Sequence, residues 1–231
     1  MADFQFKQFS IMQDMCGMKV GTDGVLLGAW ASGGNRILDV GTGTGLIALM
    51  MAQRFPMAYV DAIDIDGDAC RQALENSISS PFANRICIHH TSLQNYSSTE
   101  LYDAIVSNPP FFVGSLKNPD KKRSMARHTD TLPFVDLFAG AKHLLAPGGI
   151  LSLIVPVEVL GQIEEQAVYK GFVLSRRCGV KTVERKSPKR YLLAFSKSRT
   201  GEFEDSLEVL MKQGQSRSEW YAELTKDFYI K

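Results

Sequence analysis

The stretch ILDVGTGTG, residues 37–45, decides the fold of this chain. Its first four residues are mostly apolar, and an apolar, helix-prone run follows the last glycine over residues 46–52. This succession of buried strand, glycine turn and helix is the way a parallel α/β sheet brings backbone N–H groups up against a ligand. The stretch therefore predicts a nucleotide-like cofactor at the turn.

The spacing of the glycines distinguishes between two cofactors. The dinucleotide fingerprint G-x-G-x-x-G would need a glycine at position 46, which is occupied by Leu46. The pattern D-x-G-x-G-x-G is matched from Asp39 to Gly45 and favours S-adenosylmethionine over NAD. We expect Gly41 and Gly43 to approach the cofactor, and Asp39 to reach its cationic amino-acid end through hydrogen bonds or water.

A second carboxylate supports the same site. Residues 58–63 form the next predicted strand, which delivers Asp64 roughly 20 residues beyond the glycines, the spacing at which a carboxylate meets ribose hydroxyls. Asp61 falls in the middle of this strand, and Asp66 is expected to cap the helix that begins near Gly67. Asp64 is therefore the predicted ribose ligand.

The sequence Asn108-Pro109-Pro110-Phe111 follows the apolar strand predicted over residues 102–106. The side-chain oxygen of Asn108 and the carbonyl of Pro109 are acceptors, so together they can take the two hydrogens of an exocyclic amine and point its lone pair at an electrophile. Pro110 completes a rigid turn, and Phe111 offers a ring for stacking. These four residues predict a catalytic site that acts on a flat amino group.

The glycine motif, Asp64 and the Asn-Pro-Pro-Phe turn resemble those of class I, Rossmann-like amino-methyltransferases. Residues 9–30 are similar to a narrower group, the bacterial family that methylates N6 of adenine 37, beside the anticodon, in valine tRNA. The resemblance covers residues 4–200 and is most specific over 19–30 and 108–111.

This resemblance implies roles for residues that the motifs alone do not assign. In that family the N-terminal segment, here residues 1–34, covers the cofactor, so Lys19 and Thr22 are implied as cofactor contacts. Thr22 is also a candidate N-cap for the helix that follows it. Many such enzymes carry an acid for the cofactor adenine where this chain has Ser92, so Ser92 or backbone atoms are expected to serve. Tyrosine is frequent at the position of Phe111, and phenylalanine keeps the stacking surface while removing one hydroxyl.

Alternating strands and helices over residues 1–231 predict a single doubly wound α/β domain. The resemblance implies a Rossmann-like, seven-stranded, mostly parallel sheet whose final strand is antiparallel. The charged end of the chain, residues 201–231, is predicted to be a helix. Further elements are expected as follows: strands over residues 86–90, 150–155, 172–180 and 190–196, and helices over residues 132–145 and 157–170.

Composition fits one enzyme domain. The chain has 231 residues of which 45% are hydrophobic, enough for a full core, and no run approaches the roughly 20 apolar residues that span a bilayer. Its beginning lacks a signal-peptide pattern. Because the cysteines are scattered without a C-x-x-C pair, we expect neither disulfides nor a metal, and a location in the reducing cytoplasm. We also expect a monomer. The cysteines are Cys16, Cys70, Cys87 and Cys178.

Charge is unevenly placed along the chain. The net charge is +1, but residues 115–130 carry +3 and residues 176–190 carry +6, which leaves −8 for the rest. The first segment directly follows the catalytic turn and predicts a basic substrate loop that grips RNA phosphates. The residues expected to bind RNA are Lys121, Lys122, Arg123 and Arg127.

The predicted function is S-adenosylmethionine-dependent N6-methylation of adenine 37 in valine tRNA. The Asn-Pro-Pro-aromatic turn also occurs in methyltransferases that act on guanine N2 of ribosomal RNA and on glutamine amides of proteins, because each target is a planar amine. A non-catalytic RNA-binding module that retains the cofactor fold is a further alternative. The four residues of the turn leave these alternatives open.

Overall fold

The computed structural model describes residues 3–16, 19–109, 132–199, 201–212 and 216–230 of the chain. Its helices are α1 (Thr22–Trp30), α2 (Leu46–Arg54), α3 (Gly67–Ile78), α5 (Phe134–Leu144), α6 (Leu160–Tyr169) and α7 (Glu219–Leu224), with short 3-10 turns at Ala83–Arg85 and Val157–Val159. Its strands are β1 (Phe4–Gln5), β2 (Ser10–Ile11), β3 (Arg36–Val40), β4 (Tyr59–Asp64), β5 (Ile86–His90), β6 (Tyr102–Ser107), β7 (Leu145–Pro156), β8 (Val173–Val183), β9 (Arg190–Ser196) and β10 (Glu204–Met211). None of the helices in these ranges is both long and apolar enough to cross a membrane.

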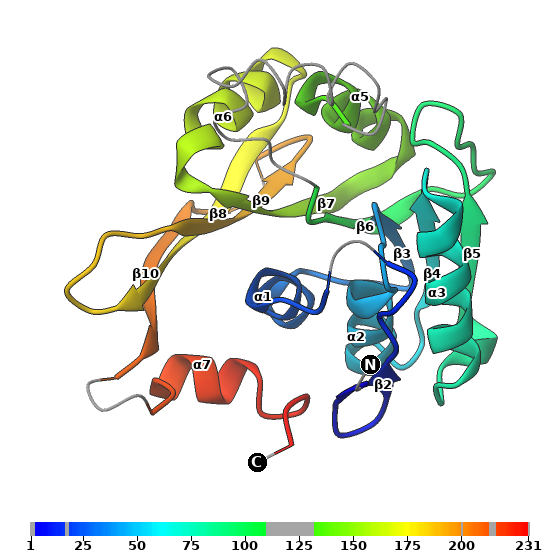
Figure 1. Cartoon of the computed structure of the whole chain (residues 1–231). Coiled ribbons are helices and arrows are strands. Elements are labelled where there is room, and N and C mark those ends of the chain that lie inside the picture. The colour runs from blue at the N-terminus through cyan, green and yellow to red at the C-terminus, as the bar shows by residue number, and fades with distance from the viewer. Residues whose placement is uncertain (1–2, 17–18, 110–131, 200, 213–215, 231) are drawn as a thin grey trace, which may run out of the picture.

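The main sheet has the strand order β10-β8-β9-β7-β6-β3-β4-β5 (Figure 1). From β3 the chain winds outward through β4 to β5, then returns to the other side of β3 and continues through β6 to β7. The winding direction therefore reverses between β3 and β6. In open α/β sheets, ligands bind beyond the carboxyl ends of the strands at this reversal. The hydroxyl of Ser107, the last residue of β6, donates to the backbone oxygen of Val40 at 2.8 Å and ties the two strand ends together.

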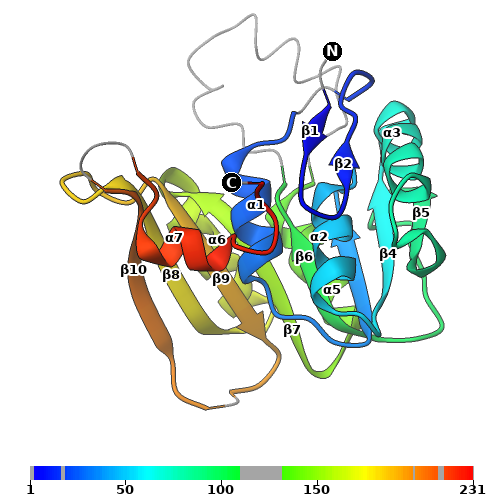
Figure 2. The same ribbon diagram turned by 90° about the horizontal axis from the view of Figure 1, so that it is seen from below.

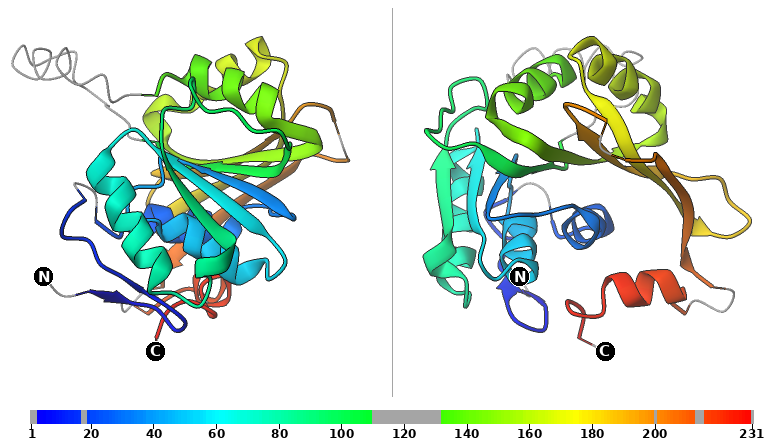
Figure 3. Two further views of the ribbon diagram at one scale, coloured as in Figure 1. Left: turned by 90° about the vertical axis from the view of Figure 1, so that its right-hand side faces the viewer. Right: turned by 180° about the vertical axis from the view of Figure 1, so that it is seen from behind.

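Helices cover both faces of the sheet. Figures 1 and 3 show α5 and α6 on one face and α1, α2 and α3 on the other. Neighbouring residues of a strand point to opposite faces, so Ile37 packs in the core beneath α1 and α2 while Leu38 packs in the core beneath α5 and α6. In β6, Val106 packs in the core beneath α1 and α2, and Ile105 packs in the core beneath α5 and α6. Burial on both sides explains why most residues of these strands are apolar.

The predicted α/β architecture is confirmed. The seven expected strands are present, and β9, the last of them, runs antiparallel to both β7 and β8. The prediction of a helix over residues 201–231 is wrong: β10 extends the sheet as an eighth strand, parallel to β8, and of the residues described in that region only the six of α7 form an α-helix. The prediction that Asp66 caps α3 is confirmed, since its side chain accepts a hydrogen bond from the backbone of Asp68.

The two ends of the described chain pack against each other. Figures 2 and 3 show the N-terminal hairpin of β1 and β2 near the segment that follows α7. The backbone of Lys7 donates to Phe228 at 2.8 Å, and Phe6 forms a bridge with Tyr229 while their rings stack at 5.9 Å. Arg217 lies over the Tyr229 ring at 4.3 Å. We refer to this contact between residues 4–9 and residues 216–230 as the terminal clasp.

Candidate active site

The glycine turn at the end of β3 adopts backbone angles that favour glycine. Gly41, Gly43 and Gly45 have φ values of 73°, 55° and 81°, in the left-handed region where side chains with a Cβ are strained. A Cβ added at Gly41 would meet no atom within 4 Å. The bare backbone at Gly41 therefore faces open space, as a close approach by a ligand requires.

That open space is a cavity of about 660 Å³. Three parts of the chain line it: the segment that leads into α1, the glycine turn with the start of α2, and the residues that follow β6. The wall is completed by the last residue of β7, the 3-10 turn that follows it and the first residue of β9, which contribute Pro156, Glu158 and Arg190. The cavity thus lies at the reversal point between β3 and β6, where sheet topology predicts a ligand.

Six of the predicted site residues line this one cavity: Lys19, Thr22, Gly41, Gly43, Asn108 and Pro109. The first and last of them, Lys19 and Pro109, are far apart in the sequence, and the ends of β3 and β6 bring the set together. Asp39, Asp64 and Ser92 are not part of the lining. Six further predicted residues lie outside the described ranges, namely Pro110, Phe111, Lys121, Lys122, Arg123 and Arg127.

Asp39 is fully buried beneath the glycine turn. One carboxylate oxygen, Oδ2, accepts hydrogen bonds from the Thr42 hydroxyl at 2.7 Å and from the backbone of Ala48 at 3.1 Å. The other, Oδ1, has no hydrogen-bond partner among the described residues. Burial raises the pKa of Asp39 to about 7, and the nearby charge of Asp64 adds to that rise. Asp39 therefore holds the turn to the start of α2, with one polar atom left to pair.

Asp64 supports the same turn from β4. Its Oδ2 accepts a hydrogen bond from the backbone of Gly43 at 2.8 Å, and its Oδ1 accepts one from Asp66 at 3.0 Å. Among the carboxylates near the end of β4, Asp64 is thus the one joined to the glycine turn. At the end of the next strand, the Ser92 side chain accepts from the backbone of Asn95 at 3.3 Å.

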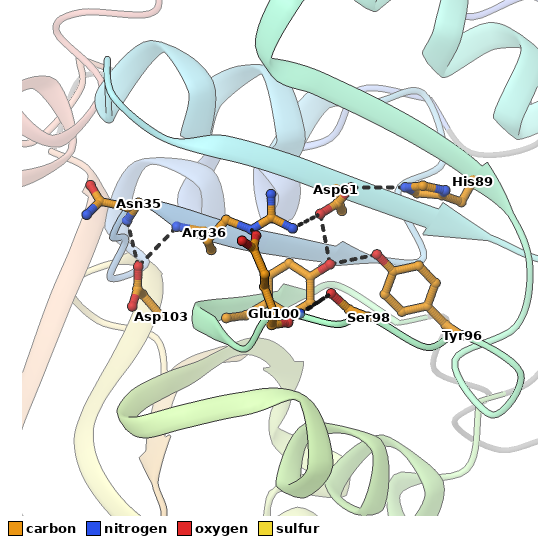
Figure 4. A network of polar contacts seen from close by, with 9 residues as sticks. Asn35, Arg36, Asp61, His89, Tyr96, Ser98, Glu100 and Asp103 are labelled. Carbon is orange, nitrogen blue, oxygen red and sulfur yellow. Dashed lines mark hydrogen bonds and ion pairs between the residues drawn. The ribbon is translucent and has the colours of Figure 1, made fainter.

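Asp61 belongs to a different group of side chains, shown in Figure 4. Its Oδ2 accepts from the Tyr102 hydroxyl at 2.8 Å and from Arg36 at 3.1 Å, and its Oδ1 lies 3.0 Å from Nε2 of His89. Asp61, Cys87 and His89 each offer one atom that could bind a metal ion, and these three atoms lie within 4.8 Å of one another. The cysteine spacing in the sequence did not predict a metal site. Asp61 is already engaged by protein partners across three strands.

Two polar side chains that the sequence reasoning missed fix the N-terminal segment to the turn. The amide of Asn76 accepts from the backbone of Met12 and donates to the oxygens of Met12 and Thr44, each at 2.9 Å. Gln72, one helical turn earlier on α3, accepts from the backbone of Met15 at 3.0 Å. Both side chains are almost completely buried. We refer to Asn76 and Gln72 as the amide clamp. Their four-residue spacing on one face of a helix was visible in the sequence, but their partners were not.

An ion pair at the cavity was also missed. Asp23, in the first turn of α1, accepts from Nε of Arg190 at 2.7 Å, and both residues line the cavity. The expectation that Thr22 caps this helix is wrong, because Gly21 occupies the N-cap and no side chain caps the helix there. Asp23 instead connects the start of α1 to the start of β9. No local pattern links residues that are 167 positions apart.

Comparison with known proteins gives close relatives over nearly the whole chain. A family model described as the methyltransferase small domain matches residues 21–162. A tRNA1(Val) (adenine(37)-N6)-methyltransferase from Parabacteroides distasonis is 50% identical, with 99% of this chain and 98% of the relative covered. A protein of the same name from Bacteroides thetaiotaomicron is 45% identical, with 98% and 97% covered.

A more distant similarity to solved structures agrees on the fold. The crystal structure of a predicted O-methyltransferase from Agrobacterium tumefaciens superposes with a TM-score of 0.69 at 19% identity, and the match covers 89% of this chain and 96% of that one. At this level of identity the likeness concerns the arrangement of the sheet and its helices.

Proposed function

Because the chain belongs to the tRNA1(Val) (adenine(37)-N6)-methyltransferase family, we propose that it transfers a methyl group from S-adenosylmethionine to N6 of adenine 37 in valine tRNA. The observation that carries the proposal is the position of Asn108. It directly follows β6 and lines the same cavity as the glycine turn. A hydrogen-bond acceptor for the target amine and a turn of the kind that binds a cofactor thus line one cavity.

The residues around the cavity fit S-adenosylmethionine, which when bound supplies an electrophilic methyl group on a sulfonium. The turn at Gly41 presents backbone without a Cβ, and Lys19 and Thr22 face the same cavity. The unpartnered Oδ1 of Asp39 gives the amino-acid end of the cofactor a nearby acceptor, directly or through water. We assign the remaining contacts to Gly43, to Asp64 at the ribose hydroxyls and to Ser92 or its backbone near the adenine.

Asn108 and Pro109 prepare the amine for attack. The lone pair of an adenine amine is delocalised into the ring, which makes the nitrogen a weak nucleophile. Two acceptors, the Asn108 side-chain oxygen and the Pro109 carbonyl, bind the two amine hydrogens and favour a pyramidal nitrogen with its lone pair aimed along the line of transfer. The N-methylated cation is acidic enough to lose its proton to water or a backbone acceptor, so the mechanism needs no strong general base.

The substrate must also present its base to Asn108. An adenine in an anticodon loop has to leave its stack, at a cost of a few kcal/mol. We assign Phe111 to stack on the extracted base, with Pro110 stiffening the turn, and Lys121, Lys122, Arg123 and Arg127 to RNA phosphates. The proposed enzyme acts as a monomer on cytoplasmic tRNA and uses no metal.

Single-turnover methylation of a valine tRNA transcript tests this function. The expected product, identified by mass spectrometry of the nucleosides, is N6-methyladenosine, and a transcript with guanine at position 37 should stay unmodified. In Asn108→Ala the rate should fall by about 100-fold or more because the amine loses its orientation, whereas RNA binding should change little. The matched control is Asn84→Ala, which removes an exposed amide from the turn before β5.

Two results would contradict the proposal. A normal single-turnover rate in Asn108→Ala would remove its amine-orienting role, and a product other than N6-methyladenosine would remove the adenine assignment. Labelled cofactor incubated with bulk tRNA, ribosomal RNA and protein separates the guanine and glutamine alternatives, and no transfer to any of them would indicate a binding module.

A further inference from the structure

The basic segment 176–190 divides into two parts with different surroundings. In its first part, Arg176 lies over the ring of Trp30 at 3.7 Å and donates to the backbone oxygen of Trp30 at 2.9 Å. Arg177 pairs with Asp205 of β10 at 2.5 Å and with Glu164 of α6 at 3.5 Å. Both cations therefore already have partners within the protein.

The second part lies beside the candidate active site. β9 begins at Arg190, which pairs with Pro156, the last residue of β7. The turn between β8 and β9 therefore projects from the carboxyl edge of the sheet, the edge that carries the cavity. Figure 2 shows this hairpin and the start of α1 toward the same end of the molecule. The backbone of Val157 donates to the oxygen of Lys189 at 3.2 Å and fixes the turn against the end of β7.

The side chains of this turn present positive charge to solvent. Arg185, Lys186 and Lys189 are exposed, and none of them forms an ion pair with a described carboxylate. The only acid in the turn is Glu184. Arginine and lysine held in a row at the edge of an active site match the spacing of a polyanion better than they match a small ligand. We refer to residues 184–190 as the basic turn.

Arg190 connects the basic turn to the cavity. It lines the cavity and forms the 2.7 Å ion pair with Asp23, in which both side chains remain more than a third exposed. The Nε of Arg190 donates to Asp23, and its Nη1 donates to the backbone oxygen of Lys189. An exposed carboxylate partner can be exchanged for a phosphate, because the N–H groups of a guanidinium bind either anion. The exchange leaves Arg190 paired and releases the start of α1 from β9.

We propose that the basic turn is a phosphate-binding surface for the RNA substrate, with Arg190 as its member nearest the cavity and Asp23 as the carboxylate that a phosphate replaces there. The proposal rests on the proposed function, since it names the surface by which the same substrate is held. RNA binding and methylation are separate measurements, so failure of the proposed RNA-binding surface can be distinguished from failure of the proposed function.

The first experiment compares two triple variants of equal charge. Arg185→Gln, Lys186→Gln and Lys189→Gln together remove three cations from the basic turn. The control replaces Lys142, Lys170 and Arg199 with glutamine. These residues precede β7, precede β8 and follow β9, so they lie toward the opposite edge of the sheet. Filter binding of valine tRNA across a salt series should show that the first variant loses about two units of the log–log salt slope, since each phosphate contact contributes about 0.7–0.9. The control should keep the wild-type slope.

Either of two outcomes would overturn the proposal that the basic turn binds RNA. Equal slopes in the two triple variants would mean that only overall charge matters, and an unchanged slope in the basic-turn variant would mean that RNA does not reach it. Wild-type protein that binds tRNA with the expected slope but methylates no RNA would count against the proposed function and leave the surface standing. Circular dichroism confirms that both variants are folded.

The second experiment tests the exchange at Arg190 by a double-mutant cycle. Asp23→Asn should tighten RNA binding because Arg190 no longer has a competing carboxylate, and Arg190→Gln should weaken it and lower the salt slope by about one unit. The double variant should bind like Arg190→Gln alone. If Asp23→Asn tightens RNA binding equally in the Arg190→Gln background, the effect is general repulsion between the Asp23 carboxylate and RNA. The proposal that a phosphate replaces Asp23 at Arg190 would then be wrong.

Discussion

Asp39 is an acid that the fold removes from water, and the described part of the chain supplies hydrogen bonds to one of its two oxygens. Burial raises its pKa from 3.8 to about 7. A folded-state pKa above the unfolded one means that the native protein binds this proton more tightly than the unfolded chain does. The contribution of Asp39 to stability is therefore fully present below about pH 4 and is lost as the pH rises through about 7.

Asp39→Asn should flatten this part of the stability profile. A shift of about three pKa units corresponds to about 4 kcal/mol, so the free energy of unfolding of the wild type should fall by up to that amount, relative to the variant, between about pH 4 and pH 8. Urea unfolding at several pH values, without cofactor, measures the difference. Parallel profiles for the two proteins would mean that Asp39 stays ionised in the folded state.

Asp64 differs from Asp39 because it lies at the open end of its strand. Asp64→Ala should weaken S-adenosylmethionine binding by about 1.5–3 kcal/mol for each charge-assisted hydrogen bond to ribose that is lost. The loss of its bond to Gly43 should add to this effect. Isothermal titration measures the affinity directly.

The control for that variant is Asp66→Ala, which removes the cap of α3 two residues further along. It should lower stability by about 1 kcal/mol and leave cofactor affinity unchanged. If Asp66→Ala weakens binding more than Asp64→Ala does, the ribose ligand has been misassigned within this short segment.

At the scale of elements, α3 holds the N-terminal segment through the amide clamp. Asn76→Ala would leave three backbone groups without their partner, and each buried group left unpaired costs about 1–3 kcal/mol. We expect faster hydrogen exchange over residues 10–16 and weaker cofactor binding, because the segment that follows lines the cavity. Glu75→Ala, one residue away and exposed, should change neither. Exchange that rises equally everywhere would show a global loss of stability in place of a local role.

The strand β10 shows where prediction of elements from sequence ends. The other seven strands of the main sheet were predicted because each carries its own signal, such as the apolar run of β3 and its glycine turn. β10 is acidic and mostly exposed over Glu204–Leu207, with no alternation of apolar and polar residues. It is a strand because β8 offers it a free edge and because Arg177 pairs with Asp205 across that edge. Neither reason is contained in residues 204–211 themselves.

At the scale of the whole molecule, the terminal clasp joins the first and last described segments. Tyr229→Ala removes a ring that meets Phe6, Arg217 and the hydroxyl of Tyr221. Loss of a largely packed aromatic side chain should lower the free energy of unfolding by about 2 kcal/mol. The same change at Tyr169, which is 76% exposed, should stay within about 0.5 kcal/mol. Thermal unfolding of the two variants compares them, and equal melting temperatures would show that the clasp adds no stability.

The candidate site was predictable to the extent that its parts are local. The glycine turn, Asp64 and Asn108 each lie at or directly after the end of a strand, and parallel strands place their ends at one edge, so their proximity follows from the sequence pattern. The pairing of Asp23 with Arg190 and the contact of Asn76 with Met12 join residues far apart in the chain. Such contacts depend on the packed tertiary structure, which no short window of sequence encodes.

The terminal clasp also sets an order of events during synthesis on the ribosome. Residues 4–9 leave the exit tunnel early, but the segment that holds them, residues 216–230, is translated long after the inner strands of the sheet. A nascent chain that stops after β9 has its glycine turn and Asn108, yet its N-terminal hairpin has no C-terminal partner. The hairpin leads directly to the residues fixed by α3 and then to the wall of the cavity. The N-terminal hairpin therefore gains the contacts of the terminal clasp only after residues 216–230 have been translated, so the first residues made are among the last to reach their final packing.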